Sequence, residues 1–133
     1  MSTIKFSMLL WALLAVGLSC SQAQKGSNLS AKPFKELMDK TPKKTILDIR
    51  TDGEVARGVI PGAIQLDYYT PDFKQKVAKL DKNTPVFLYC AVGGRSGSAA
   101  PILQQMGFKN VYNLGGGINA WQSAGYAVVP LKR

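Results

Sequence analysis

Short apolar runs alternate with helical patterns along most of this chain, and this alternation constrains its fold more than any other feature. β-Branched and apolar residues predict strands at residues 45–49, 63–66, 86–89 and 111–114. Helical spacing and capping residues predict helices at residues 30–40, from 51 to 58, at 72–80, from a glycine-rich loop to 106, and at 118–124. Strands that alternate with helices predict an α/β fold, in which helices flank both faces of a central parallel β-sheet.

Two local patterns refine this outline. Thr51 and Glu54 have the spacing of a capping box, which predicts the start of a short helix. Pro101 is compatible with two starts of the helix that contains it. If that helix begins at Ser96, the proline removes an internal hydrogen bond and kinks it; if Ser98 is the N-cap, the proline falls in the first turn at little cost.

The first residues of the chain have the pattern of a secretory signal. A 13-residue apolar run follows Lys5 and covers residues 6–18, whereas a membrane-spanning helix needs about 20 residues. We therefore expect a signal peptide over residues 1–23. One small domain is expected over residues 24–133, beginning with a short flexible lead-in at 25–28.

Two processing routes fit this signal. Residues 21–23 carry small side chains at the offsets that ordinary signal peptidase requires. Residues 17–20 instead resemble a bacterial lipobox, in which Cys20 would be lipidated and would attach the protein to a membrane. Both routes place the mature protein in the periplasm or another extracytoplasmic space. Both also leave Cys90 as the only thiol of the domain.

The composition excludes several kinds of site. The chain has no histidine and 2 cysteines, which excludes Ser-His-Asp and Cys-His catalysis and metal sites built on histidine or on cysteine alone. We therefore expect no metal. The 17 basic and 8 acidic residues give a net charge of +9, which favours small anions. Nucleic acid is not an expected partner, because the lysines are scattered and no basic stretch is interleaved with aromatic residues.

The loop after the strand at 86–89 carries the most chemical information. It runs Cys90, Ala91, Val92, Gly93, Gly94, Arg95, Ser96. In a parallel sheet, sites form beyond the carboxyl ends of the strands, which is where this loop lies. Glycines let successive backbone N–H groups turn inward around an anion, and such a nest would stabilise a thiolate without any histidine. The simpler alternative is a buried structural cysteine beside an ordinary glycine turn.

Five segments in the same order resemble a single-domain rhodanese, a sulfurtransferase of the thiosulfate type. They are Leu-Asp-Ile-Arg at 47–50, Glu54, Gly-Val-Ile-Pro-Gly-Ala at 58–63, the loop from Cys90 to Ser96, and a glycine-rich signature over 115–126. The resemblance covers roughly residues 29–129 and implies a rhodanese-like fold.

The resemblance also implies a mechanism that requires no cofactor. The Cys90 thiolate would take the outer sulfur of thiosulfate or another small anionic sulfur donor, and a thiol or cyanide would then accept it from the Cys90 persulfide. Backbone N–H groups of Ala91, Val92, Gly93, Gly94 and Ser96 would hold the persulfide. Arg95 would either orient the anion or brace the loop.

Three charged residues at and just after the end of the first predicted strand could be catalytic by their proximity to the loop. Asp48, Arg50 and Glu54 are instead expected to form a structural salt-bridge set that braces the sheet end. Tyr68 and Tyr69 either line the mouth of the site or pack on the surface.

Two other functions compete with sulfur transfer. Ala91 stands where active rhodaneses often carry a basic residue, so the chain could be a non-catalytic rhodanese module that carries sulfur or docks a partner. A phosphatase or arsenate reductase is less favoured, because the related phosphatases have Cys-x5-Arg whereas Cys90 and Arg95 are separated by four residues. The shorter loop makes a narrower cradle, which suits sulfane sulfur better than a phosphate group.

Overall fold

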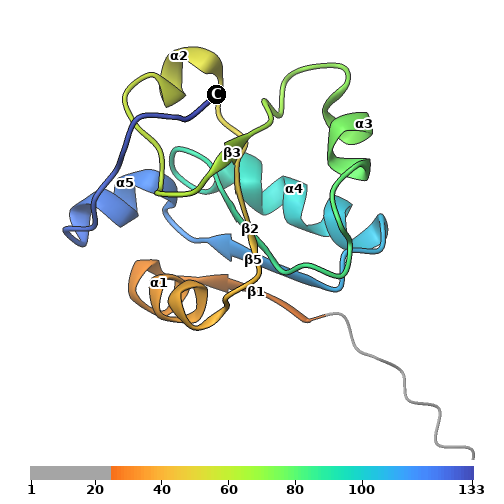
Figure 1. Ribbon diagram of the computed structural model, residues 1–133, viewed down its shortest axis with the longest axis horizontal. Helices are drawn as coiled ribbons and strands as arrows, with labels where there is room; N and C mark the ends of the chain where they lie inside the picture. The colour runs from red at the N-terminus through yellow and green to blue at the C-terminus, as the bar shows by residue number, and fades with distance from the viewer. Residues whose placement is uncertain (1–24) are drawn as a thin grey trace, which may run out of the picture.

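The computed structural model describes residues 25–133; the predicted signal peptide, residues 1–23, and Cys20 lie outside the described residues. Strands and helices alternate along the described chain (Figure 1). The strands are β1 (Lys25–Leu29), β2 (Thr45–Asp48), β3 (Ile64–Gln65), β4 (Val86–Tyr89) and β5 (Asn110–Leu114). The helices are α1 (Ala31–Lys40), α2 (Asp52–Val55), α3 (Phe73–Ala78), α4 (Gly94–Gln105) and α5 (Gly117–Ser123). No helix in this part of the chain is long and apolar enough to cross a membrane.

The strands form one parallel sheet in the order β1-β5-β4-β2-β3. β4 lies in the middle of the sheet, and all four of its residues are buried. A strand covered on both faces needs apolar side chains in both directions, which explains its continuous run Val-Phe-Leu-Tyr. Because all strands run the same way, Asp48, Tyr89 and Leu114 lie at the same end of the sheet.

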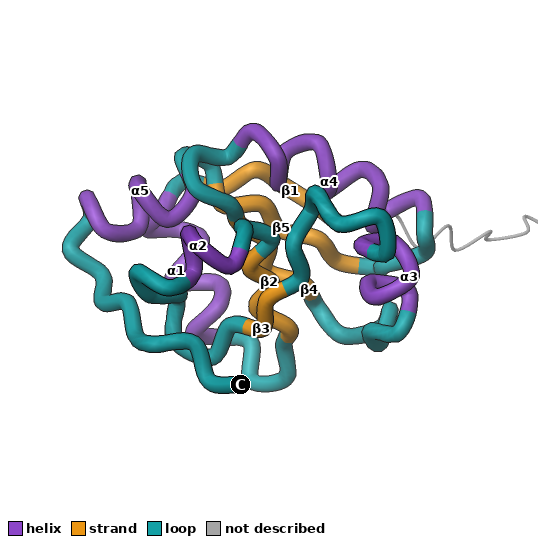
Figure 2. The backbone as a smooth tube through the Cα atoms, turned by 90° about the horizontal axis from the view of Figure 1, so that it is seen from above, coloured by secondary structure: helices purple, strands orange, loops and turns teal. Residues whose placement is uncertain are grey.

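Helices cover both faces of the sheet, as Figure 2 shows: α1, α2 and α5 on one face, α3 and α4 on the other. The first face packs a core that includes Phe34, Phe87 and Trp121, with Phe34 edge-on to both other rings. The second face packs Leu88 and Leu103, both fully buried, with Cys90 at its edge. The predicted α/β fold is therefore confirmed.

The start of the domain differs from the prediction. Residues 25–28 were expected to be a flexible lead-in, but they belong to β1, which pairs in parallel with β5 from Lys25 opposite Asn110 to Leu29 opposite Leu114. The sequence Lys-Gly-Ser-Asn-Leu contains no β-branched residue, so its strand comes from backbone pairing at the sheet edge rather than from side-chain propensity.

The structure also tests the two local predictions, the capping box and the start of the helix that contains Pro101. The capping box is confirmed: the Thr51 hydroxyl accepts from the Glu54 N–H, while the Glu54 carboxylate accepts from the Thr51 N–H. The helix with Pro101 begins at Gly94, so a start near Ser98 is wrong and the proline lies inside the helix. The early start matters because it brings the positive end of α4 to the loop that begins at Cys90.

Candidate active site

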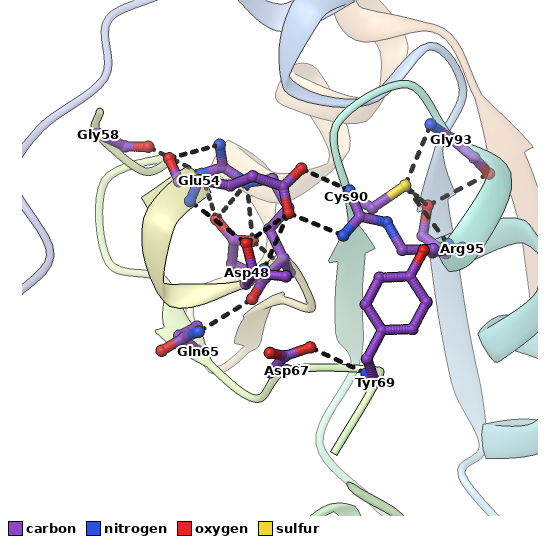
Figure 3. Close-up of polar contacts among 12 residues, drawn as sticks. Asp48, Glu54, Gly58, Gln65, Asp67, Tyr69, Cys90, Gly93 and Arg95 are labelled. Atoms are coloured by element: carbon purple, nitrogen blue, oxygen red, sulfur yellow. Dashed lines mark hydrogen bonds and ion pairs between the residues drawn. The ribbon is translucent and has the colours of Figure 1, made fainter. Parts of the chain in front are cut away.

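Cys90 directly follows β4 and points into a cradle made by its own loop (Figure 3). Its sulfur accepts hydrogen bonds from the N–H of Gly93 at 3.2 Å, the N–H of Ser96 at 3.5 Å and the hydroxyl of Ser96 at 3.3 Å. The residue is 1% exposed, and Ser96 is fully buried. Three donors directed at one buried sulfur form a site that favours negative charge on it.

Two opposing effects, burial and hydrogen bonding, set the pKa of Cys90. Burial alone would raise its pKa, but hydrogen bonds from the Ser96 side chain and from the backbones of Ser96, Gly93 and Val92 outweigh burial and lower the pKa below its ordinary value. The thiolate is the nucleophilic form of cysteine, so the loop activates this sulfur without a histidine.

Gly93 gives the loop its shape, because its backbone conformation is one that other residues rarely adopt. Gly93 has φ +100°, in the left-handed region, and is the N-cap of α4. This conformation turns the Gly93 N–H toward the sulfur, while its carbonyl accepts from the Gly97 N–H and begins the helix. The sulfur therefore lies at the N-terminus of a 12-residue helix, whose dipole adds to the stabilisation of the thiolate.

The N-terminus of α5 holds the other side of the loop. The N–H of Ile118 donates to the carbonyl of Cys90 at 2.9 Å, and the N–H of Asn119 donates to that of Ala91 at 3.2 Å. Gly117 has φ +59°, and a Cβ there would overlap the Ala91 carbonyl. Sequence reasoning assigned these residues only to a family signature. Their spatial role could not be seen because 25 or more residues separate them from the loop.

Arg95 does not point into the cradle. Its two terminal nitrogens donate to both carboxylate oxygens of Glu54, at 2.8 and 2.6 Å. The bond from Arg95 is the main cause that lowers the pKa of Glu54 to about 2, and the same bond raises the pKa of Arg95. Of the two roles expected for Arg95, this geometry corresponds to bracing the loop, with Glu54 as the anchor on α2.

The expected set of Asp48, Arg50 and Glu54 divides into two. Arg50 forms a buried ion pair with Asp48 at 2.7 Å and also donates to the carbonyl of Gly58. It reaches only the backbone carbonyl of Glu54, at 3.4 Å, because the Glu54 carboxylate is engaged by Arg95. Asp48 and Arg50 therefore brace the sheet end, whereas Glu54 belongs to the loop.

An aromatic side chain that the sequence left undecided lies next to the loop. The guanidinium of Arg95 lies over the ring of Tyr69, 5.3 Å from its centroid. Tyr69 is 67% exposed and Val92 of the loop is 65% exposed. The sequence left open whether Tyr69 lines the mouth of the site or packs on the surface. The residue is recognised as part of the site by its contact with Arg95.

The described residues contain no group of three or more His, Cys, Asp or Glu side chains arranged to hold a metal ion. The site offers one buried thiol with a lowered pKa, backbone N–H donors from Gly93 and Ser96, and an arginine paired with a carboxylate. A family comparison gives the context for this arrangement: the rhodanese-like domain model matches residues 30–124. The chain belongs to the rhodanese-like family.

Relatives of this rhodanese-like chain agree with that assignment. It is 33% identical over 103 residues to a protein named sulfurtransferase from Allochromatium vinosum, covering 77% of this chain and 94% of the relative. It is 34% identical over 94 residues to a putative sulfurtransferase, YtwF, from Bacillus subtilis, covering 71% and 88%. The family predicted from the five sequence segments is thus confirmed.

Solved structures show the same fold. A rhodanese-related protein from Thermoplasma volcanium superimposes with a TM-score of 0.68 at 28% identity, over 77% of this chain and 96% of that one. The shared fold places the chain among rhodanese-like proteins. The particular reaction depends on the site described above.

Proposed function

We propose that this rhodanese-like protein is a sulfurtransferase that moves sulfane sulfur through a persulfide on Cys90. The observation that carries the proposal is the set of three hydrogen bonds, from Gly93 and Ser96, to the buried sulfur. These donors lower the pKa of Cys90 against the effect of burial. The names of the relatives, sulfurtransferase and putative sulfurtransferase, support the same class of reaction.

The proposed first half-reaction uses thiosulfate as donor. The Cys90 thiolate attacks the outer sulfur of thiosulfate, a new S–S bond forms, and the S–S bond of thiosulfate breaks. The electron pair of that bond leaves with sulfite, and Cys90 becomes a persulfide with one negative charge. Backbone donors preorganised around the sulfur stabilise this charge without reorganising during the step.

The second half-reaction returns the enzyme to its thiolate. Cyanide attacks the outer sulfur of the persulfide, takes it as thiocyanate, and leaves the electron pair of the S–S bond on Cys90. A thiol acceptor would instead deliver a proton and leave as a persulfide. Arg95, locked on Glu54, keeps the loop closed in both steps rather than travelling with the substrate.

Intact mass spectrometry tests this function directly. The purified protein is measured before and after thiosulfate, with Cys90→Ser as the matched variant. We expect a gain of one sulfur atom on the wild-type protein only, reversed by cyanide with release of thiocyanate. Absence of that gain at saturating thiosulfate would exclude thiosulfate as the donor.

Sulfur carriage without turnover is the second candidate, and one observation favours it. Ala91 adds no charge to the loop, and Arg95, its only charged residue, is already paired with Glu54. A carrier would accept sulfur onto Cys90 but release thiocyanate no faster than an unstructured thiol. Steady-state thiocyanate production, measured on the same samples, separates the two functions.

We also propose that the protein works outside the cytoplasm, as a soluble periplasmic protein or attached through a lipid on Cys20. The apolar run at residues 6–18 and the sequence around Cys20 support this proposal. Fractionation of bacterial cells with Cys20→Ser as the comparison tests it. A membrane-bound wild type that becomes soluble in the variant would support lipidation, and a cytoplasmic wild type would contradict export.

A further inference from the structure

A small polar pocket lies beside the Cys90 loop, and its lining includes residues of α2 and α5. Figure 2 shows these two helices on the same face of the sheet. The volume of the pocket is about 180 Å³, and its lining includes Arg50, Glu54, Arg57, Ala91, Asn119 and Gln122. Cys90, Gly93 and Ser96 do not line it, so it is separate from the sulfur cradle. The volume is several times the roughly 30 Å³ that one water molecule occupies in the liquid, enough for a small oxyanion.

The charges around this pocket leave one cation uncompensated. Asp48 pairs with Arg50, and Arg95 pairs with Glu54. Arg57, by contrast, is exposed and has no ion-pair partner among residues 25–133. The Glu54 carboxylate does not cancel it, because both of its oxygens are bound to Arg95.

The remaining polar groups of the pocket can complement an anion. Nη1 of the buried Arg50 has only a 3.4 Å contact, to the carbonyl of Glu54, so its donor capacity is not used up. Asn119 and Gln122 present amide groups from α5 at the surface of the same pocket. An arginine with adjacent amide donors recognises carboxylate and sulfonate groups.

The pocket is connected to the reacting sulfur by named contacts. Ala91, the residue after Cys90, forms part of its wall. Glu54 borders the pocket and holds Arg95 beside the Cys90 cradle, as Figure 3 shows. The pKa of Arg95 is raised first by its bond to Glu54 and also by the charge of Cys90, so the arginine lies within the field of the sulfur.

We propose that this pocket is an anion subsite, in which Arg57, assisted by Asn119 and Gln122, binds the oxyanion group of a substrate. The inference rests on the proposed sulfur transfer. Thiosulfate is too short to place its sulfonate in a pocket that excludes the cradle while its outer sulfur meets Cys90, so the bound group is the carboxylate of a longer thiol acceptor. Arg57 thereby supplies, from the end of α2, the positive charge that Ala91 does not supply from the loop.

The first test measures binding without turnover. In the Cys90→Ser variant of the purified protein, which cannot form a persulfide, we titrate glutathione, and sulfite as a bare oxyanion, and follow backbone amide shifts, including that of Asn119. Adding Arg57→Gln should weaken binding roughly tenfold, as expected for loss of a charge-assisted contact. Arg57→Lys should retain part of the affinity. Lys74→Gln, on α3 at the opposite face, should leave it unchanged.

The second test measures turnover in the protein with Cys90 intact. Arg57→Gln should raise KM for glutathione, a thiol with carboxylates, but not for uncharged 2-mercaptoethanol, and should leave KM for thiosulfate unchanged. Unchanged binding of both sulfite and glutathione in Arg57→Gln would overturn the subsite. The binding assay needs no transfer, so failure of the proposed function would not be mistaken for failure of the subsite.

Discussion

Two arginine–carboxylate pairs lie at the same end of the sheet. They have nearly the same N···O distance but differ in sequence separation and exposure. Asp48 and Arg50 are two residues apart, and their side chains are 0% and 5% exposed. Glu54 and Arg95 are 41 residues apart, and their side chains are 29% and 16% exposed. The N···O distances are 2.7 and 2.6 Å, so distance alone does not distinguish their roles.

Their surroundings do distinguish them. The first pair is closed on itself: Arg50 also donates to the carbonyl of Gly58, so it ties β2 to the turn after α2 within one short stretch of chain. The second pair joins α2 to the first turn of α4 and therefore holds the position of the Cys90 loop. We infer that the buried pair mainly stabilises the fold and that the partly exposed pair mainly supports reactivity.

The largest expected effect comes from breaking the buried pair. Asp48→Ala leaves the Arg50 guanidinium buried without its counter-charge, which should cost about 3–5 kcal/mol of unfolding free energy. Urea unfolding followed by circular dichroism measures this loss. A loss below about 1 kcal/mol would show that the pair is not the structural element inferred here.

Breaking the second pair should separate reactivity from stability. Glu54→Gln removes the charge that holds Arg95, so we expect sulfur transfer to fall about tenfold, equivalent to about 1.4 kcal/mol of barrier. Unfolding free energy should fall by about 1 kcal/mol or less, as for other partly exposed pairs. Lys35→Gln, which removes the exposed Lys35–Asp39 pair on α1, is the control and should alter neither quantity.

The sulfur cradle gives a third, smaller test, because Ser96 stabilises the thiolate and not an ion pair. Ser96→Ala removes the hydroxyl that donates to the sulfur, so the pKa of Cys90 should rise. The pH dependence of Cys90 alkylation by iodoacetamide measures the shift, and unfolding free energy should change by about 1 kcal/mol. Alkylation profiles that superimpose would remove Ser96 from the activation of the thiol.

The smallest expected effect is the acid dependence of the second pair. The pKa of Glu54 is about 2 in the folded state, below its ordinary value of 4.5, so the folded state binds this proton more weakly than the unfolded state does. Its stabilising contribution is complete above pH 4.5 and is lost as the pH falls toward 2. The stability difference between wild type and Glu54→Gln, on the order of 1 kcal/mol at neutral pH, should therefore shrink in acid. A difference that is constant with pH would contradict the ion pair.

Much of the fold could be predicted because its signals are local. β4 is a continuous apolar run, and α2 carries a complete capping box between Thr51 and Glu54. β1 could not be predicted, since its five residues form a strand only when β5 is present to pair with them. The first turn of α4 could not be predicted either, because Gly93 and Gly94 are as compatible with a loop as with a helix start.

In the site, too, the local features could be predicted from the sequence and the long-range contacts could not. Cys90 and its glycines are adjacent in sequence, so their chemistry could be inferred from spacing. The partner of Arg95 could not, because Glu54 is brought to it only by the packing of α2 beside the loop. No sequence pattern indicated a binding role for Arg57. That role depends on which neighbouring charges already have ion-pair partners, and only the structure shows this.

The pairing of β1 has a consequence for the order in which the domain folds. Within residues 25–133, β1 is the first strand, and its only neighbour in the sheet is β5, the last strand. During synthesis, β1 has no strand to pair with until residues 110–114 have left the ribosome. Such a distant closing contact slows folding, because the chain must bring its ends together before the contact stabilises anything. The sheet edge beside β5 therefore completes late, and truncation before residue 110 should leave a chain that cannot complete its sheet.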